Sequence, residues 1–213
     1  MAEVYFAGDG HLGHRRICKY RPEFSTTREH DEAILKAFDH VTKRDKTFFT
    51  GDWVFEKYAL DIISQIRGDK HLVLGNHDLL ELIPEMLKVF NVISGDFKYK
   101  EFWVTHIPIH PDEMRGKMNI YAHTHNSKIN DWRYFCTSME QINYKAVSLQ
   151  EIRKEFAERK EEVEKIVTNT DLAKIITQQR ERDKNRDLLD MQAIANSQYQ
   201  GTLSQWSKQG NFF

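Results

Sequence analysis

The chain has 213 residues, enough for one well-buried domain with an appendage but short for two full domains. Its formal net charge of −1 excludes a global field that would draw it to nucleic acid or to a membrane surface, although it leaves room for a local basic patch. The start lacks a signal-peptide pattern and no apolar run is long enough to span a bilayer, so we expect a cytoplasmic protein. Cys18 and Cys136 form neither a disulfide framework nor a zinc or redox motif.

The first half of the chain alternates short apolar runs with helical patterns. A capping-box spacing from Thr26 to Glu29 opens one helix, and the apolar spacing from Leu60 to Ile66 predicts another. Strands that alternate with helices predict the parallel sheet of an α/β fold, which binds ligands beyond the carboxyl ends of its strands. The predicted strands are VYFA at 4–7, TFFT at 47–50 and HLVL at 71–74.

After these strands, the pattern from Glu81 predicts one more helix, which ends at about Phe90. Shorter β-like runs follow and would complete a mixed sheet or form a second sheet. They are NVISG, FWVTH, NIYAH, YFCTS and YKAVS.

A change of composition near residue 150 predicts a boundary, because all four prolines precede residue 117. We predict a domain at 1–150 and a helical extension at 151–213, with a charged amphipathic helix starting at Leu149. A polar tail beyond the helices is either docked through its aromatic residues or disordered. The second helical stretch includes Leu172, Ile175, Ile176, Leu188, Leu189 and Ile194, and the aromatic residues of the tail are Trp206, Phe212 and Phe213.

Metal-competent side chains follow the predicted strands directly. Because the carboxyl ends of parallel strands meet at one edge of a sheet, we expect these side chains to converge. A lone histidine is far more often an ordinary polar residue than a ligand, but five such segments in order favour a metal site. The segments supply Asp9 and His11, then Asp52, then Asn76, His77 and Asp78, then His106, and finally His123 and His125.

The chemistry of these groups predicts the kind of metal site. Carboxylate, imidazole and amide ligands without thiolate suit divalent Mn, Fe, Ni, Zn or Co, of which Mn is favoured in vitro. Seven candidate ligands exceed one tetrahedral site, so we predict two ions roughly 3.5–4 Å apart. Asp52 is the natural bridge between them. The glycines before Asp52 and Asn76 would let the backbone turn sharply there.

These segments resemble the motifs of the calcineurin-like metallophosphoesterase superfamily over roughly residues 4 to 150: Asp-x-His, Gly-Asp, Gly-Asn-His-Asp, a lone His and His-x-His. More narrowly, GDGHLGH, KYRPEF, THIPIH and AHTH resemble small stand-alone phosphoesterases of bacteria and phages, which would act in the host cytoplasm if phage-encoded. The resemblance implies a four-layer α/β/β/α sandwich, here with an added C-terminal helical segment. It also implies one ion at Asp9, His11 and His125, a second ion at Asn76, His106 and His123, and Asp52 bound to both.

The sequence departs from the usual family pattern at two positions. Ala122 precedes His123 where the family usually has glycine, and Gly10 replaces a larger residue between Asp9 and His11. Neither change removes a ligand. Alanine disfavours a positive φ, so the loop at residue 122 is expected to be conventional or slightly shifted. Since all seven ligands are present, we expect a catalytically competent protein.

The expected reaction is hydrolysis of a phosphate ester, by a phosphodiesterase or a phosphatase. A hydroxide held by two metals would attack phosphorus in line with the leaving oxygen. His77 follows a ligand directly and is placed to donate a proton to the leaving alkoxide, the role that the resemblance also implies. Asp78 is expected to orient His77, to cap a helix that starts at Leu79, or to do both.

The sequence says less about the substrate, which we expect to be a nucleotide-type small molecule. His14 and Arg15 are candidate phosphate contacts, and Asn76 is a third candidate besides its ligand role. Trp53 is expected to fill the core rather than to stack on a base. The other basic residues of the first segment are expected to be structural or solvated: Arg16, Lys19 and Arg21.

Two other functions stay open. A nuclease of the same superfamily would need an extended basic or aromatic surface to follow a strand, and the near-neutral chain has no obvious one, so nucleic acid is the less favoured partner. An interaction protein would act through its C-terminal helices, which are also the candidate surface for homo-oligomers. No membrane partner is expected.

Overall fold

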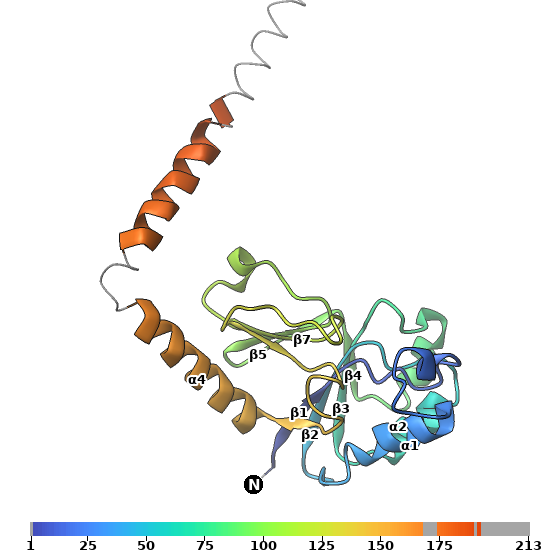
Figure 1. The fold of residues 1–213 in the computed structure, drawn as a ribbon. Helices are drawn as coiled ribbons and strands as arrows, with labels where there is room; N and C mark the ends of the chain where they lie inside the picture. The colour runs from blue at the N-terminus through green and yellow to red at the C-terminus, as the bar shows by residue number, and fades with distance from the viewer. Residues whose placement is uncertain (1, 168–173, 190, 193–213) are drawn as a thin grey trace, which may run out of the picture. The chain divides into compact units, whose positions relative to one another are not determined.

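The computed structural model describes residues 2–167, 174–189 and 191–192 (Figure 1). The chain divides into two compact units, Met1–Lys160 and Glu161–Phe213. The first unit is an α/β structure with two sheets, as the alternation of strands and helices predicts, and it contains every predicted site residue. It also includes the opening turns of the helix that the sequence assigns to the extension.

The first sheet has five strands in the order β4-β3-β2-β1-β9. β1 to β4 are parallel, and β9 pairs with β1 in the antiparallel direction. The carboxyl ends of the parallel strands therefore lie along one edge, where the predicted ligand segments begin. The strands are β1 Val4–Ala7, β2 Lys46–Thr50, β3 Asp69–Val73, β4 Val92–Ser94 and β9 Val147–Ser148, which confirms the three strands predicted first.

The second sheet has four strands in the order β5-β6-β7-β8. β5 and β6 form an antiparallel hairpin, while β6, β7 and β8 are parallel. β5 is absent from the predicted strands, because its sequence DFKY has no apolar run, and it ends at a tight turn in which Lys100 has a φ of +52°. The strands are β5 Asp96–Tyr99, β6 Phe102–Thr105, β7 Met118–Tyr121 and β8 Tyr134–Cys136.

The two sheets pack against each other through aromatic side chains. The ring of Phe48 on β2 lies 5.3 Å from that of Phe97 and 4.9 Å from that of Tyr99, both on β5. The neighbouring Phe49 contacts Phe38 and Phe90 instead. Because successive side chains of a strand point to opposite faces, β2 contacts the second sheet on one face and the helical side on the other.

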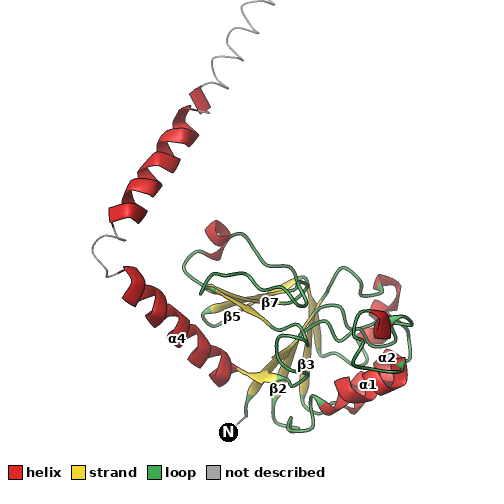
Figure 2. Ribbon diagram, in the orientation of Figure 1, coloured by secondary structure: helices red, strands yellow, loops and turns green. Residues whose placement is uncertain are grey.

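Two helices lie on the Phe49 side of the first sheet (Figure 2). α1, Thr27–Lys36, begins at the predicted capping box, where the Thr26 hydroxyl accepts a hydrogen bond from the Glu29 amide at 3.1 Å. α2, Ala59–Gln65, follows β2 as predicted. Together with the strands between them, these helices form the expected crossover connections.

The helix predicted from residue 81 to about Phe90 is mostly irregular. It consists of the 3-10 turn η2, Leu80–Leu82, and the single-turn α3, Ile83–Met86. Further turns continue to Phe90, whose side chain is 1% exposed and packs on the first sheet. Two other 3-10 turns are η1, Ile17–Lys19, and η3, Pro111–Met114.

α4, Leu149–Val167, begins inside the first unit. Ile152 is fully buried and Phe156 is 3% exposed. The Phe156 ring stacks on Phe102 of β6, with the ring centroids 5.4 Å apart. These contacts explain why the compact unit continues past the predicted boundary at residue 150.

Residues 174–189 and 191–192 are helical, in agreement with the second predicted helical stretch. Several predicted apolar positions of the extension lie outside the described residues: Leu172, Ile194, Trp206, Phe212 and Phe213. No helix in the described part of the chain combines the length and the hydropathy that a bilayer crossing requires.

Candidate metal centre

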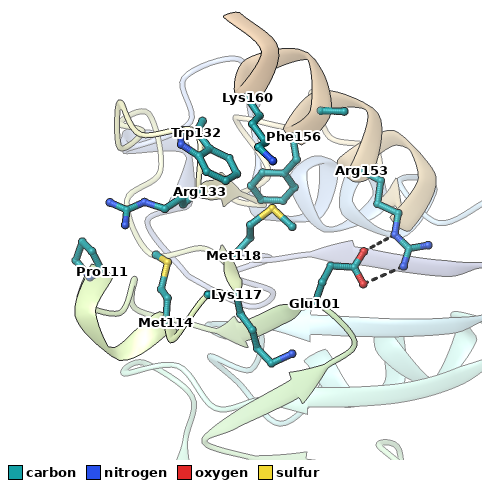
Figure 3. Close-up of a pocket in the computed structure, with 12 residues that line it drawn as sticks. Glu101, Pro111, Met114, Lys117, Met118, Trp132, Arg133, Arg153, Phe156 and Lys160 are labelled. Carbon is teal, nitrogen blue, oxygen red and sulfur yellow. Dashed lines mark hydrogen bonds and ion pairs between the residues drawn. The ribbon is translucent and has the colours of Figure 1, made fainter. Parts of the chain in front are cut away.

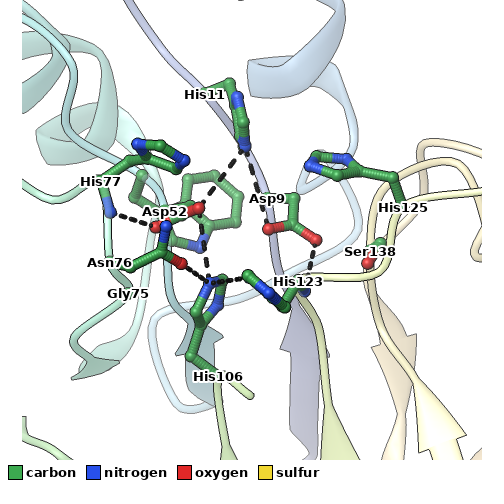
Figure 4. A network of polar contacts seen from close by, with 12 residues as sticks. Asp9, His11, Asp52, Gly75, Asn76, His77, His106, His123, His125 and Ser138 are labelled. Atoms are coloured by element: carbon green, nitrogen blue, oxygen red, sulfur yellow. Dashed lines mark hydrogen bonds and ion pairs between the residues drawn. The ribbon is translucent and has the colours of Figure 1, made fainter. Parts of the chain in front are cut away.

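All seven predicted ligands meet at one edge of the two sheets, beyond the carboxyl ends of β1, β2, β3, β6 and β7 (Figure 4). They form two groups, and within each group one ligand atom of every residue lies within 4.8 Å of the others. Asn76 joins the second group through its amide oxygen, which is 3.0 Å from His106 Nε2. The first group is Asp9, His11 and His125, and the second is Asp52, His106 and His123. We call the two groups with Asn76 the metal centre.

Asp52 belongs to the second group and also faces the first. Its Oδ2 is 3.8 Å from His11 Nε2 and 3.4 Å from His106 Nε2, so one carboxylate oxygen faces a histidine of each group. Its Oδ1 accepts a hydrogen bond from the His77 amide at 2.8 Å. This position is the one that a bridging carboxylate would need.

The backbone of the metal centre is strained. Positive φ is uncommon for residues other than glycine and costs on the order of 1–3 kcal/mol each, so it persists only where the surrounding structure enforces it. Such outliers cluster at functional sites. Among the predicted ligands, positive φ occurs at Asp9 (+54°), His11 (+49°), Asp52 (+58°), His123 (+74°) and His125 (+48°).

Glycines make room for the ligands. Gly51 has a φ of +89°, and a Cβ at this position would lie 2.3 Å from His106 Nδ1. A Cβ on Gly75 would lie 2.1 Å from Asp52 Oδ1, so this glycine is required by close approach rather than by its φ. At the departure from the family pattern, a Cβ on Gly10 would lie 2.3 Å from the Trp53 ring.

The second departure from the pattern is also explained. Ala122 is fully buried and keeps a negative φ, while His123 after it takes the positive value. Residue 122 itself therefore keeps an ordinary backbone conformation, within the prediction of a conventional or slightly shifted loop, and the positive φ falls on the next residue. Trp53 is fully buried, which confirms its predicted place in the core.

The electrostatics of the metal centre differ between its ligands. Burial by itself raises the pKa of Asp9 and of Asp52, but neighbouring histidines outweigh it and lower both values. Burial lowers the pKa of His11 and of His123. Burial also opposes the charged form of His106, yet the hydrogen bond and charge of Asp52 raise its pKa. The carboxylates are thus held ionised, which is the form that binds metals.

Two polar atoms of the metal centre without a hydrogen-bond partner fit a divalent cation. Asp9 Oδ1 and His11 Nε2 are buried and have no hydrogen-bond partner among the described residues. Buried polar atoms are nearly always paired, so an orphaned carboxylate oxygen beside an orphaned imidazole nitrogen indicates a missing partner. Oxygen and imidazole donors without thiolate suit Mn, Fe, Co, Ni or Zn.

Asp78 does not play either of its predicted roles. Its carboxylate accepts hydrogen bonds from four backbone amides, those of Asp52, Trp53, Val54 and Gly75, at 2.8–3.0 Å. Neither oxygen makes a hydrogen bond to His77 among the described residues, and η2, which begins after Leu79, has no side-chain cap. Burial raises the pKa of Asp78, although the amides oppose the shift. Asp78 instead joins the loops after β2 and β3, which carry Asp52 and Asn76.

The histidines have different outer partners. His106 Nδ1 is 2.9 Å from the Thr50 carbonyl oxygen and donates to it. His125 Nδ1 is 3.1 Å from Glu140 Oε1, and this hydrogen bond outweighs burial and raises the pKa of His125. Burial raises the pKa of Glu140, but His125 and Arg21 lower it to about 2.

A cavity of about 460 Å³ adjoins the first group. The exposed His77 lies at this cavity, with its ring 6.3 Å from that of His11. The ring of Phe55 stacks on His11 at 4.6 Å. The lining residues are His11, His14, Ile17, Tyr20, Arg21, Phe55, His77, His125, Asn126 and Glu140.

Two of the predicted substrate contacts behave differently. His14 lines the cavity, whereas the exposed Arg15 lies outside the lining and pairs with Glu56, with Nη2 2.8 Å from Oε1. Arg21, expected to be structural or solvated, is structural, since it is 1% exposed. Phe55 and Glu140 are absent from the predicted site. Glu140 carries the same signal as the predicted ligands, because it follows the end of β8.

A second cavity, of about 500 Å³, lies between the start of α4 and the segments around η3 and Trp132 (Figure 3). Its walls are mainly apolar, with Met118 and Phe156 among them, and an ion pair between Glu101 and Arg153 at its rim. None of the predicted site residues lines it. The metal centre is therefore the better candidate for chemistry.

Comparisons with known proteins give relatives but no activity. No protein-family profile matches the chain. The gene 66 protein of Mycobacterium phage L5 is 29% identical over 166 residues, which covers 61% of this chain and 80% of that protein. The crystal structure of a protein of unknown function, AQ665 from Aquifex aeolicus, matches with a TM-score of 0.58 and 25% identity, over 72% of this chain and 99% of that chain. The α/β fold is shared over nearly the whole length of the Aquifex protein.

Proposed function

We propose that this chain is a metal-dependent phosphoesterase of the calcineurin-like kind, which hydrolyses a phosphate ester with two divalent ions. The observation that carries the proposal is the arrangement of two ligand groups that meet at the Asp52 carboxylate, with five of the seven ligands at positive φ. A merely structural polar cluster would have little reason to keep so much backbone strain.

The architecture that we propose is the four-layer α/β/β/α sandwich. Its support is the position of α1 and α2 on one face of the first sheet (Figure 2), the contact between the two sheets, and the contact of Phe156 on α4 with β6. In this arrangement both sheets direct strand ends toward a single edge, so seven ligands from five segments can converge.

Two bound ions would supply a nucleophile at neutral pH and neutralise charge on the phosphoryl group. Asp9, His11 and His125 would hold one ion, Asn76, His106 and His123 the other, and Asp52 both. The chain itself would supply the proton for the leaving group. His77 suits this task because it is exposed, lies at the cavity beside the first group, and is anchored through its amide to Asp52.

The cavity supports a substrate with a planar or apolar leaving group, such as a nucleotide. Phe55 and Tyr20 provide aromatic walls, and the ring of His14 lies 5.0 Å from Phe55 and 5.7 Å from Tyr20. Aromatic faces bind bases of any sequence by stacking. Asn76, exposed at the second group, is the remaining candidate for a phosphate contact.

The test is a panel of chromogenic phosphate mono- and diesters, cyclic nucleotides and single-stranded nucleic acid, each with Mn, Ni, Zn or Mg. We expect hydrolysis of at least one small ester with Mn. The matched inactive variant is Asp52→Asn, which keeps the size of the side chain and should lose bound metal and on the order of 10³-fold in rate. The control is Asp61→Asn, which changes a carboxylate of α2.

Three outcomes would overturn the proposal. The first is a wild-type protein that binds no divalent ion in elemental analysis. The second is the absence of any hydrolysis across the panel. The third is an Asp52→Asn variant with unchanged metal content and rate. Cleavage confined to single-stranded nucleic acid would replace the small-ester substrate with the nuclease alternative.

A further inference from the structure

The two ligand groups differ in what holds their histidines. The Nδ1–H of His106 is held by a neutral backbone carbonyl, that of Thr50. The corresponding nitrogen of His125 faces a carboxylate, that of Glu140. A histidine that donates from Nδ1 keeps Nε2 free for an ion, and a carboxylate partner makes the ring a stronger ligand than a carbonyl does.

Glu140 is itself fixed in place. Arg21 Nε donates to the same Oε1 at 2.9 Å, and the two side chains are 2% and 13% exposed. Arg21 Nη2 also donates to the backbone oxygen of Asp9 at 2.6 Å. The guanidinium of Arg21 therefore joins the loop that carries Asp9 to the carboxylate that is hydrogen-bonded to His125. Asp9 and His125 are both ligands of the first group.

Arg21 is in turn held by residues farther from the metal centre. Arg21 Nη1 lies 2.7 Å from His30 Nε2, and His30 Nδ1 lies 2.9 Å from Asp31 Oδ1. Since Arg21 can only donate, His30 accepts at Nε2 and donates from Nδ1. The side chains of Arg21, His30 and Asp31 are all buried. The orientation of Glu140 is thus determined by a rigid network within α1 and the segment before it.

We propose that Glu140, held by Arg21, is a positioning residue that orients His125 and strengthens the ion site formed by Asp9, His11 and His125, while leaving the site of His106 and His123 unaffected. This inference rests on the proposed function only in that it requires the centre to bind metal. Its consequence is that the two ion sites are unequal, and that the first site is the one strengthened by an outer carboxylate.

A purely structural role for the Arg21–Glu140 pair would have a different signature. Glu140 Oε2 is buried and has no hydrogen-bond partner among the described residues, so the fold alone does not satisfy every polar atom of the pair. Loss of an outer partner of a metal ligand typically lowers metal affinity about 10- to 100-fold. A purely structural pair would instead weaken both sites together when it is lost, because a loosened fold affects the loops of both ligand groups.

The experiment uses the full chain and manganese. Glu140→Gln keeps the size and a hydrogen-bond acceptor but removes the charge, and Glu140→Ala removes both. Titration calorimetry and elemental analysis should show two sites in the wild type, with one site weakened about 10- to 100-fold in Glu140→Gln, at least as much in Glu140→Ala, and the other site unchanged. The matched control is Glu23→Gln, whose carboxylate bonds to Tyr144.

A double-mutant cycle assigns the weakened site. Combined with His125→Ala, Glu140→Gln should cause no further loss of affinity, whereas combined with His123→Ala it should still weaken the remaining site. If Glu140→Gln does not fold, Arg21→Lys provides the same test, because lysine keeps the charge but not the paired donors. It should weaken the same single site.

The inference is overturned if Glu140→Gln binds both ions as tightly as the wild type, if both sites weaken equally, or if its effect adds to that of His125→Ala. In each of these results the wild type still binds two ions, so the proposed function stands. A wild type that binds no manganese would overturn the proposed function and this inference together.

Discussion

The metal centre and the described part of α4 beyond residue 160 are both rich in charged side chains, yet they differ in every physical respect that matters for chemistry. In the metal centre the carboxylates are buried, their partners come from distant segments, and the backbone is strained. Along α4, Glu161 and Lys165 are exposed and pair across one helical turn with 2.8 Å between Nζ and Oε1. Charge alone therefore says little, whereas charge that is buried and held by strained loops indicates function.

This comparison can be tested with pairs of substitutions. Each pair changes one residue in or near the metal centre and one residue of the same type elsewhere in the chain. Among these paired comparisons, the largest effect on rate is expected at His77. His77→Ala should keep both ions but lower turnover by about 10²-fold for esters with poor leaving groups, because the proton donor is lost. Esters with good leaving groups should be nearly unaffected. Rates with both kinds of ester and metal analysis provide the measurement.

The control for His77 is His110→Ala, which removes another exposed histidine, at the start of η3. It should change neither rate. A His77→Ala variant with wild-type rates on poor leaving groups would exclude this residue as the proton donor, and a variant that loses metal would make it a structural part of the centre.

Two glycines provide the next comparison. Gly75→Ala places a methyl group where 2.1 Å separates it from Asp52 Oδ1, while Gly95→Ala places one where no atom lies within 4 Å. We expect Gly75→Ala to cost about 1–3 kcal/mol of stability and to weaken metal binding, since the loop or Asp52 must move. Gly95→Ala should be nearly neutral. Thermal unfolding with and without manganese measures both, and equal behaviour of the two variants would contradict the close approach.

Two glutamates test the same contrast through the pH dependence of the free energy of unfolding. The pKa of Glu140 is lowered to about 2, so the stability that it contributes to the metal-free protein is present above its ordinary pKa and is lost as the pH falls through the folded value. A shift of this size corresponds to at most about 3 kcal/mol, and solvent screening should reduce it to roughly 1–2 kcal/mol. Wild type and Glu140→Gln should therefore converge in stability between about pH 4.5 and pH 2.

The comparison residue is Glu161, whose pKa is also lowered by its hydrogen bond with Lys165. It is fully exposed, so Glu161→Gln should leave the acid unfolding curve unchanged. Urea unfolding at a series of pH values in the presence of a chelator measures all three proteins. A difference between wild type and Glu140→Gln that is independent of pH would mean that the charge of Glu140 contributes nothing.

The sequence predicts the centre of this fold better than its periphery. Strand ends followed by Asp, Asn or His are visible as short local patterns, and the structure brings all seven of these side chains together. The capping box at Thr26 is equally local and is present. Asp78 was misassigned because adjacency in sequence placed it beside His77, whereas its carboxylate turns inward to four backbone amides.

Other features depend on contacts that no local pattern reveals. The partnership of Arg21 with Glu140 joins residues separated by more than half of the chain, so Arg21 is recognisable only as a basic residue near the first motif. The strain at the five ligands is a property of the folded backbone. The boundary at residue 150 rests on composition, but Ile152 and Phe156 beyond it are core residues, and Phe156 contacts Phe102 and Phe135 of the second sheet.

The last comparison concerns the C-terminal extension, where the smallest effect on chemistry is expected. A truncation after Gln150 would remove Ile152 and Phe156 from the core, and loss of a buried phenylalanine alone costs about 3–5 kcal/mol. Such a truncation would confuse instability with lost function.

A truncation after Lys160 keeps these contacts and ends at the boundary of the first compact unit. We expect its hydrolysis rate and metal content to equal those of the full chain, because among the described residues none of the metal centre or its cavity lies beyond Glu140. Sedimentation of both proteins then isolates the contribution of residues 161–213 to assembly. A rate that falls with the truncation after Lys160, at unchanged thermal stability, would place the extension in the reaction and contradict the assignment of the chemistry to the first unit alone.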